Sequence, residues 1–464
     1  MIQTEVMPLN RALHDSIIIA DQRQTPQLLS ITEIIDTIDP FVFFEQAKLM
    51  EGNRFFWTSS SDDFYLVGAG DAKQMTVEKS NRFSLIEQQW QEIIADTIIY
   101  NPFEVPGTGP IAFGGFSFDP SKQQTHLWSK FKASQFRVPS YLLTIHEGQC
   151  YLTVNVIVRA EDHPKQLQYE IEKDKQLLLC KDTTVKMPDS PSVSSKKEIA
   201  PLQWKELVKE ATKFIHEGNA DKIVLAREMQ VTFADAANLT PILYQLTRLQ
   251  SNSFIFAYEN GTDCFLGASP ERLVRVQDKQ LLSTCLAGTA PRGETQNEDH
   301  LIGLDLLNDE KNRAEHQFVV EMIQKAVEEC CVDVDVPEKP VLYPLKNLQH
   351  LYTPVKGHIK ANYSIIDVVS RLHPTPALGG LPRDKSLAFI REKELMDRGW
   401  YGAPIGWMGT QQNGEFAVAI RSALIKGKQA SLFSGCGVVK DSDPEAEYQE
   451  TNIKFAPMLS VLGD

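Results

Sequence analysis

The sequence lacks a long hydrophobic run. No stretch of its 464 residues approaches the roughly 20 consecutive apolar residues that a membrane-spanning helix requires. Near the N-terminus, the apolar run Ser16–Ala20 is short and is flanked by Asp15 and Asp21, unlike the longer apolar core of a secretory signal peptide. The sequence therefore predicts neither a membrane span nor a secretory leader.

Paired cysteine motifs are also missing. The seven cysteines are an odd number, and none belongs to a CxxC pair. Only Cys330 and Cys331 lie close together, and adjacent cysteines seldom form a disulfide. This pattern argues against a structural zinc site and against a disulfide framework. We therefore expect free thiols in a reducing, cytoplasmic compartment.

Positive charge is scarce relative to negative charge. The chain has 47 lysine and arginine residues against 61 aspartate and glutamate residues, so its formal net charge is -14. Such a chain repels nucleic acid and anionic membrane surfaces as a whole. It can still bind a small anion, because a local basic pocket or a bound cation overrides the overall field.

The composition is typical of a folded protein with a sizeable core, since 42% of the residues are hydrophobic and 23% are charged. The segment 182–198 includes MPDSPSVSSKKE, which has two prolines, four serines and no apolar periodicity. We expect a linker there, between a first region (1–195) and a second region (196–464).

Strand and helix patterns are interspersed without regular βαβ alternation. In the first region, strands are expected at Phe64–Gly68, Gly109–Phe118 and Tyr151–Val158. The second region is expected to have helices over 202–217, 241–249 and 301–329, strands over 222–226, 415–426 and 429–439, and a run of strands and turns over 254–289. A final helix should start at Pro444, with Asp443 as its N-cap. This order favours an α+β fold.

Two residues next to apolar strands could perform acid–base chemistry. Lys222 opens the strand Ile223–Ala226, where desolvation would make a neutral amine available as a base. Glu271 follows a Ser-Pro turn, and an apolar wall beside it would make its carboxyl group a general acid. Each also has a structural explanation: Lys222 could extend to solvent, and Glu271 could pair with Arg272.

Two helices carry carboxylates that could hold a cation. Glu315 is expected on the apolar face of the 301–329 helix, with Phe318, Val319 and Met322, where a buried carboxylate needs a partner. A metal ion would suffice, as would an ion pair with Lys311 or Arg313.

The final helix repeats this theme. Glu447, Glu450 and Lys454 share one helix face, at positions i, i+3 and i+7. Two such acidic helices would suit Mg²⁺, which prefers oxygen ligands. The alternative is a solvated helix face stabilised by the Glu450–Lys454 pair.

Two further features indicate anion binding. The glycines of Ser434–Val438 would let backbone N–H groups approach a ligand closely, just before the N-terminus of the final helix. Arg421, expected within a strand, could bind a carboxylate through its guanidinium group.

Together these segments resemble the chorismate-utilising enzymes. The motifs occur in the family's order and span Lys222 to Lys454, about half of the chain: DKIVLAR, GASPERL, LAGTAPRG, DEKNRAEH, LHPTPALGG, AIRSA, SGCGVV and DSDPEAEYQETNIK. In the first region, GPIAFGGFSF is similar to the N-terminal part of isochorismate synthases. The resemblance implies one large domain over 1–464, with two packed, mainly antiparallel sheets flanked by helices in an α/β/β/α-like arrangement.

The resemblance also implies an activity. Members that use water have lysine at the position of Lys222, whereas members that use ammonia usually have glutamine there. Ala287 occupies the position of the nucleophilic lysine of aminodeoxychorismate synthases. We found no convincing tryptophan-feedback motif of anthranilate synthases. The expected reaction is therefore the Mg²⁺-dependent conversion of chorismate to isochorismate, an isomerisation that needs no glutamine amidotransferase subunit.

Individual roles follow from the same resemblance. Lys222 would deprotonate the water that attacks C2 of chorismate, and Glu271 would protonate the departing 4-hydroxyl. Glu315 and Glu450 would hold Mg²⁺, with Glu447 acting through a water molecule. The other implied substrate-binding positions are Ala287, Gly288, Thr289, His373, Tyr401, Arg421, Gly435, Gly437 and Lys454.

Several alternatives remain open at the level of the sequence. A salicylate synthase shares the water chemistry and then eliminates pyruvate. An anthranilate synthase is disfavoured by Lys222, and a silent chorismate-binding protein by the intact Lys222, Glu271, Glu315 and Glu450. Isochorismate could feed menaquinone or siderophore synthesis, and the N-terminal similarity favours menaquinone. We expect a monomer or a weak homodimer.

Overall fold

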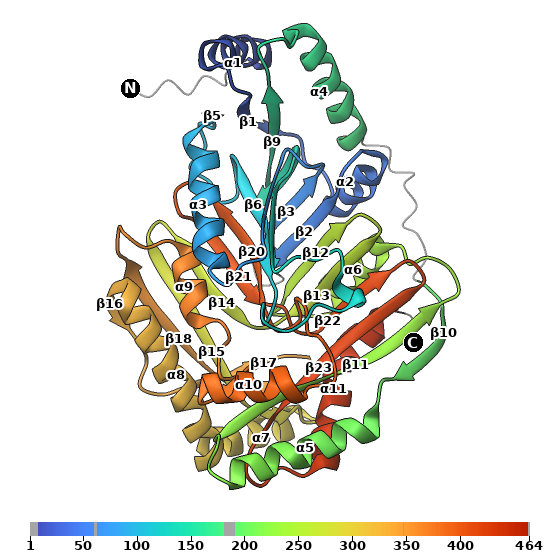
Figure 1. Ribbon diagram of the computed structural model, residues 1–464, viewed down its shortest axis with the longest axis vertical. Coiled ribbons are helices and arrows are strands. Elements are labelled where there is room, and N and C mark those ends of the chain that lie inside the picture. The colour runs from blue at the N-terminus through green and yellow to red at the C-terminus, as the bar shows by residue number, and fades with distance from the viewer. Residues whose placement is uncertain (1–7, 60–62, 181–190, 347, 463–464) are drawn as a thin grey trace.

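The computed structural model describes residues 8–59, 63–180, 191–346 and 348–462. In these residues the chain forms two large β-sheets with helices on their outer faces (Figure 1). The larger sheet runs in the order β10 (Val193–Glu198), β11 (Lys222–Phe233), β23 (Gln429–Val438), β22 (Ser422–Lys426), β13 (Asp263–Ser269), β12 (Phe254–Asn260), β2 (Arg54–Ser59), β3 (Phe64–Ala69), β8 (Tyr141–His146), β9 (Gln149–Val158), β1 (Gln27–Ile35) and β5 (Thr97–Tyr100), with β19 (Gly380–Leu381) also against β11.

The smaller sheet faces the larger one. It runs in the order β16 (Cys331–Asp335), β18 (Leu348–Ile359), β15 (Gln280–Pro291), β14 (Arg272–Gln277), β21 (Gly414–Val418), β20 (Pro404–Gly409), β6 (Ile111–Phe116), β7 (Ser134–Val138) and β4 (Lys73–Val77), with β17 (Val341–Pro344) against β18. The α-helices of the described chain are α1 (Leu9–Arg23), α2 (Pro40–Gln46), α3 (Arg82–Ala95), α4 (Pro164–Leu178), α5 (Pro201–His216), α6 (Leu239–Leu249), α7 (Gln296–Asn308), α8 (Glu310–Cys330), α9 (Ile365–Leu372), α10 (Arg383–Lys393) and α11 (Pro444–Leu462).

Strand pairing confirms the predicted mainly antiparallel α+β architecture. Among the described residues, only the pairing of β1 with β5 is parallel. Both sheets combine strands from the two halves of the sequence: Phe56 of β2 lies opposite Ala257 of β12, and Gly114 of β6 lies opposite Gly406 of β20. In each sheet, the strands of 1–195 form one block and those of 196–464 another, and the two blocks meet at these pairings (Figure 1). The exception is β10, which spans the boundary at the edge of the larger sheet.

Aromatic side chains fill the space between the two sheets. Phe55 of β2 stacks on Phe113 of β6 with ring centroids 4.4 Å apart, and Trp57 contacts the same ring edge-on. The outer face of the larger sheet packs against α1, α2, α6 and α11, and that of the smaller sheet packs against α3, α8 and α9. This order of helices, sheet, sheet and helices matches the predicted layers.

Three element boundaries differ from the sequence-based prediction. The helix expected over 301–329 is two helices, because Asp309 has extended backbone angles and caps α8 by accepting a 2.7 Å hydrogen bond from the Asn312 amide. A side chain that bonds the backbone in this way competes with helix continuation. The strand expected over 222–226 is longer and continues to Phe233.

The strand expected over 415–426 is also two strands. Residues Gly414–Val418 form β21 of the smaller sheet, and Ser422–Lys426 form β22 of the larger one. Arg421, which was expected within a strand, instead lies in the crossover with a left-handed φ of 49°. The prediction failed because both halves are apolar, and only tertiary packing assigns them to different sheets.

The expected linker lies partly outside the described residues, which resume at position 191. Its C-terminal part, Val193–Glu198, is strand β10, which pairs with β11, so the linker prediction was wrong there. The start of the final helix was predicted correctly, since Asp443 accepts hydrogen bonds from the amides of Glu445 and Ala446. Within the described ranges, no helix is both long enough and apolar enough to cross a bilayer.

Candidate active site

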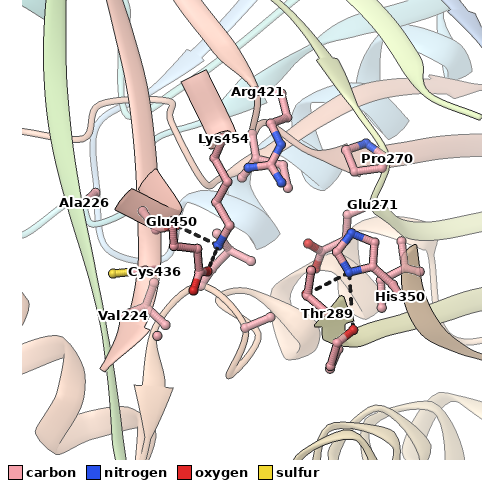
Figure 2. Close-up of a pocket in the computed structure, with 18 of the residues that line it drawn as sticks. Val224, Ala226, Pro270, Glu271, Thr289, His350, Arg421, Cys436, Glu450 and Lys454 are labelled. Atoms are coloured by element: carbon pink, nitrogen blue, oxygen red, sulfur yellow. Dashed lines mark hydrogen bonds and ion pairs between the residues drawn. The ribbon is translucent and has the colours of Figure 1, made fainter. Parts of the chain in front are cut away.

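A cavity of about 250 Å³ lies where strands of both sheets meet two helices. One wall is β11 and β23 of the larger sheet, and the opposite wall is β15 of the smaller sheet with the β13–β14 connection, which passes from one sheet to the other. Helices α8 and α11 contribute Glu315, Glu450 and Lys454. In Figure 2, Glu450, Lys454 and Cys436 lie on one side of the pocket, across from Glu271, Thr289 and His350.

Most of the predicted site residues line this one cavity although they come from distant parts of the sequence. They are Lys222, Glu271, Ala287, Gly288, Thr289, Glu315, Tyr401, Arg421, Gly435, Gly437, Glu450 and Lys454. Two predicted residues, Glu447 and His373, are not part of its described lining.

Lys222 begins β11 and points into the cavity rather than into solvent, since only 12% of its side chain is exposed. Its ammonium group forms a short ion pair with Glu315 of α8. Gly437 lies beside it on β23, where an added Cβ would be 2.5 Å from Cε of Lys222. A side chain at position 437 would therefore displace the lysine, and the solvent-directed alternative for Lys222 was wrong.

Glu271 is the second ionisable group of the predicted acid–base pair. Its side chain is buried, and burial raises its pKa to about 7 in spite of the nearby cations Arg421, Lys222 and Lys454. The expected alternative partner, Arg272, instead forms a 2.8 Å ion pair with Glu415. Glu271 is therefore a carboxyl group of which a substantial fraction is protonated near neutral pH, as a general acid requires.

Glu315 occupies the edge of the buried face of α8. The core-facing residues of this helix are His316, Val319, Val320, Ile323, Val327 and Cys330. Phe318, expected on the same apolar face as Glu315, is 46% exposed. The predicted stripe was therefore wrong by about one position, and Glu315 stands at its margin, where its carboxylate can face the cavity.

Of the three residues predicted to share one face of α11, Glu450 and Lys454 line the cavity and Glu447 does not. Lys454 forms a 2.5 Å ion pair with Glu450 and donates a 3.0 Å hydrogen bond to the carbonyl of Gly435 (Figure 2). Glu447 instead accepts a 2.7 Å hydrogen bond from Ser442, and burial raises its pKa. It lies behind Cys436, a cavity residue whose thiol pKa is also raised by burial.

Cationic and polar groups provide an anion-binding side. Arg421 is half-buried in the crossover between the sheets, and desolvation lowers its pKa. The hydroxyl of Tyr401 lies close to Gly435, where an added Cβ would be 3.2 Å from it. Together with Lys454, these residues offer two cations and a hydroxyl donor to a ligand with several carboxylates.

His373 was expected to line the pocket but faces away from it. Its side chain is buried, and its Nε2 hydrogen-bonds with the carbonyl of Phe118 at 2.9 Å. Burial lowers its pKa to about 3. The same segment brings Ala377 and Leu378 to the cavity wall instead. The segment that contains His373 therefore borders the cavity as predicted, but the imidazole ring itself packs in the core.

Sequence reasoning missed three polar residues of the cavity: Asn312, His350 and Arg398. The Nδ1 of His350 lies 2.9 Å from the hydroxyl of Thr289, its partner across the β15–β18 pairing (Figure 2). Burial lowers the pKa of His350 to about 4, so its imidazole is neutral at physiological pH. The only signal that could have identified His350 is its place on β18, the strand that pairs with the predicted site strand β15.

The donor set of the cavity fits a hard divalent cation. Glu315 and Glu450 contribute carboxylates from two helices, and each is now neutralised by a lysine. Within the described part of the chain, no cluster of three or more His, Cys, Asp or Glu residues could hold a metal by itself. Mg²⁺ commonly uses one or two carboxylates and completes its coordination with water and substrate oxygens, so two carboxylates beside an anion site suit it.

The raised pKa of Glu271 predicts a pH effect on stability. Because the folded-state pKa lies above the ordinary glutamate pKa of 4.5, the stability associated with this group is complete below about pH 4.5 and is lost as the pH rises through 7. Glutamine does not titrate, so Glu271→Gln should not show this loss. The difference between the unfolding free energies of the variant and the wild type should therefore shift in favour of the variant by up to about 3 kcal/mol from pH 5 to pH 8. Chemical denaturation at both pH values measures this.

The matched control is Glu210→Gln, at an exposed glutamate of α5. It should show the pH dependence of the wild type. If Glu271→Gln also followed the wild type from pH 5 to pH 8, the carboxyl group of Glu271 would not be titrating near neutrality.

Comparison with known proteins agrees with this geometry. A family model described as chorismate binding enzyme matches residues 11–463. The chain is 41% identical to isochorismate synthase MenF of Bacillus subtilis over 442 residues, covering 94% of this chain and 93% of that protein. It is 33% identical to the salicylate biosynthesis isochorismate synthase of Pseudomonas aeruginosa, covering 99% and 96% of the two chains.

Solved structures show the same fold. The structure described as MenF, the menaquinone-specific isochorismate synthase from Escherichia coli, superposes with a TM-score of 0.79 at 25% identity, covering 97% of this chain and 100% of that one. Family match, sequence identity and fold agree over almost the entire length. The chain therefore belongs to the chorismate-binding enzyme family.

Proposed function

We propose that this chain is an isochorismate synthase, which converts chorismate to isochorismate by adding water at C2 and expelling the 4-hydroxyl. The observation that carries the proposal is the meeting of Lys222 and Glu271 in one cavity, beside two carboxylates and two anion-binding cations. The full-length similarity to the isochorismate synthases of Bacillus subtilis and Escherichia coli supports the same activity.

Substrate binding would use the anion side of the cavity. Chorismate is a dianion, and Arg421 and Lys454 supply positive charge, with the Tyr401 hydroxyl and the backbone near Gly435 as hydrogen-bonding groups. Neutral His350 and Thr289 form a polar wall on the opposite side. Holding both charged groups of the ring orients it between the two walls, which is how binding energy contributes to rate.

The proton transfers balance between the two ionisable groups. Lys222, in its neutral amine form, accepts a proton from a water molecule as the water oxygen forms a bond to C2. The ring double bond shifts, the C4–O bond breaks, and Glu271 donates its proton so that the hydroxyl leaves as water. The pKa of about 7 leaves Glu271 substantially protonated at neutral pH, so it is suited to this donation.

The residues suited to a cofactor are Glu315 and Glu450, which would hold Mg²⁺. When bound, this cation supplies positive charge that binds a carboxylate of the substrate. Glu447 lies one turn before Glu450 on α11 and is hydrogen-bonded to Ser442, so its role would be to support the position of Glu450 and of ordered water.

Water rather than ammonia is the proposed nucleophile, because the cavity wall carries a lysine at position 222, whose neutral amine can accept a proton from water. Ala287 lines the cavity where a nucleophilic lysine would otherwise stand. No glutamine amidotransferase subunit is then needed. The similarity to proteins named MenF favours a menaquinone-type enzyme over a siderophore-type one.

The remaining proposals concern organisation. The continuation of both sheets across the junction between strands of 1–195 and strands of 196–464 supports a single domain. The seven cysteines are free thiols, and those in the cavity and core are buried, which suits a reducing cytoplasm. A monomer or weak homodimer remains our expectation.

A product assay tests the function. Purified protein is incubated with chorismate and Mg²⁺, with and without chelator and ammonium, and the products are separated by chromatography. We expect isochorismate, formed only with metal and unaffected by ammonium. Salicylate with pyruvate would instead indicate a salicylate synthase, anthranilate would contradict the water chemistry, and absence of turnover would indicate a silent binding protein.

Removing the proposed base should abolish most turnover. Lys222→Ala should lower kcat about 10²- to 10⁴-fold, the usual contribution of a positioned acid or base, while the folded structure is retained. Steady-state kinetics and thermal unfolding measure the two properties. Lys213→Ala, at an exposed lysine of α5, is the control and should keep wild-type kcat. Near-full activity of Lys222→Ala would exclude this lysine as the base.

Changing one metal carboxylate should weaken Mg²⁺ binding. Glu450→Gln should raise the Mg²⁺ concentration needed for half-maximal activity at least tenfold, because an amide oxygen carries no net charge. Titration calorimetry of the enzyme with Mg²⁺ gives an independent readout. Glu445→Gln, five residues earlier on the exposed side of α11, should titrate as the wild type does. An unchanged titration of Glu450→Gln would remove it from the coordination sphere.

A further inference from the structure

A buried ion pair lies against the cavity wall without an assigned role. We propose that Glu394 and Arg398 are positioning residues that hold the cavity segment of β11, and with it Lys222, in place. This inference rests on the proposed function for the identity of the base. It assigns no proton transfer to either residue. Arg398 also lines the cavity, and the role proposed for it here is through the backbone that it binds.

The pair is fully enclosed and bidentate. Nε of Arg398 donates to one oxygen of Glu394 at 2.7 Å, and Nη2 donates to the other at 2.6 Å. The exposed fractions of the two side chains are 3% and 1%. Isolated buried charges are strongly unfavourable, so each residue depends on the other to remain in this position.

The pair lies where one edge of β11 has no neighbouring strand among the described residues. On its outer edge, β11 pairs with β19 at Lys222 and Ile223 and with β10 from Met229 onward. Between these points, no other strand of the described chain pairs with that edge. The exposed backbone groups would need other partners, because an unpaired buried N–H or C=O is costly.

Side chains satisfy those groups. Nη2 of Arg398 donates to the carbonyl of Val224 at 2.7 Å, and the amide of Ala226 donates to Glu394 at 2.8 Å. On the same edge, Nε1 of Trp204 donates to the carbonyl of Ala226 at 3.1 Å. The ion pair therefore offers an acceptor and a donor to β11 in the places where a neighbouring strand would do so.

These contacts lie directly behind the cavity. Lys222, Val224 and Ala226 alternate along β11, so their side chains share one face, and all three line the cavity. Nη1 of Arg398 also donates to the carbonyl of Leu378 at 2.9 Å, and Leu378 lines the cavity too. The pair thus joins two segments of the wall and sets their separation.

Precise placement matters for a base that must reach a water molecule at the ring. A misplacement of about 1 Å can reduce turnover on the order of 10²-fold. Lysine cannot replace arginine here, because its single ammonium group lacks the planar fork that binds Glu394 on one side and carbonyls on the other. The expected signature of a positioning role is therefore a loss in kcat that exceeds any change in KM.

The chain offers a matched control in a second buried pair. Arg54 binds Glu259 through Nε at 2.7 Å and Nη2 at 2.6 Å, and also donates to the carbonyl of Phe44 at 2.7 Å. The side chains of Arg54 and Glu259 are 8% and 15% exposed, and neither residue is part of the described lining of the cavity. Breaking this pair tests how much a purely structural loss affects catalysis.

The experiment compares Glu394→Gln and Arg398→Lys with Glu259→Gln in the full-length, Mg²⁺-loaded enzyme. We expect all three to lower the melting temperature. The first two should lower kcat about 10- to 100-fold with KM for chorismate within threefold of wild type. Glu259→Gln should keep kcat within twofold. Hydrogen exchange should speed up in the peptide containing Ala226 for Glu394→Gln, but not for Glu259→Gln.

Two results would overturn the proposal. One is a kcat within twofold of wild type for both Glu394→Gln and Arg398→Lys. The other is unchanged exchange at the Ala226 peptide. If Glu394→Gln does not fold, Arg398→Lys carries the test, and an unchanged kcat in that variant would contradict the proposal. Failure of the wild type to form isochorismate would refute the proposed function, whereas the exchange result tests the strand contact independently.

Discussion

The pairing of β11 with β23 is the interaction on which the site depends. Its register places Val224 opposite Gly437 and Ala226 opposite Gly435, so that the lysine at the start of β11 lies beside a glycine. Any side chain at Gly437 would collide with Lys222, and one at Gly435 would approach the carbonyl of Leu225 to 2.9 Å. The two glycines therefore create the space into which a ligand and the lysine both extend.

Charge compensation is the second constraint. A cavity that receives a dianion must hold cations in its free state without leaving them unpaired. Lys222 and Lys454 are neutralised by Glu315 and Glu450, which are the two carboxylates suited to a divalent cation. Glu271 forms no comparable ion pair with another described residue, and burial raises its pKa to about 7, so that a substantial fraction is protonated at neutral pH. The same set of groups can thus serve the free enzyme and the loaded one.

Local signals predicted part of this arrangement. The Asp443–Pro444 start of α11 and the spacing of Glu450 and Lys454 depend on neighbouring residues, and both occur as expected. Motifs shared with the family identified most of the cavity residues. His373 was misplaced because its ring packs into the core beside Phe118, and His350 was missed because it matters only when β18 pairs with β15.

By itself, the sequence determined the family, the mainly antiparallel α+β class and the residue types that a chorismate-binding cavity requires. These follow from local periodicity, capping and motif order, which are written in neighbouring residues. Tertiary structure alone decided that Arg421 lies at a crossover between sheets and that Glu394 and Arg398 complete the edge of β11. Such contacts join residues more than 150 positions apart, and packing, not local pattern, brings them together.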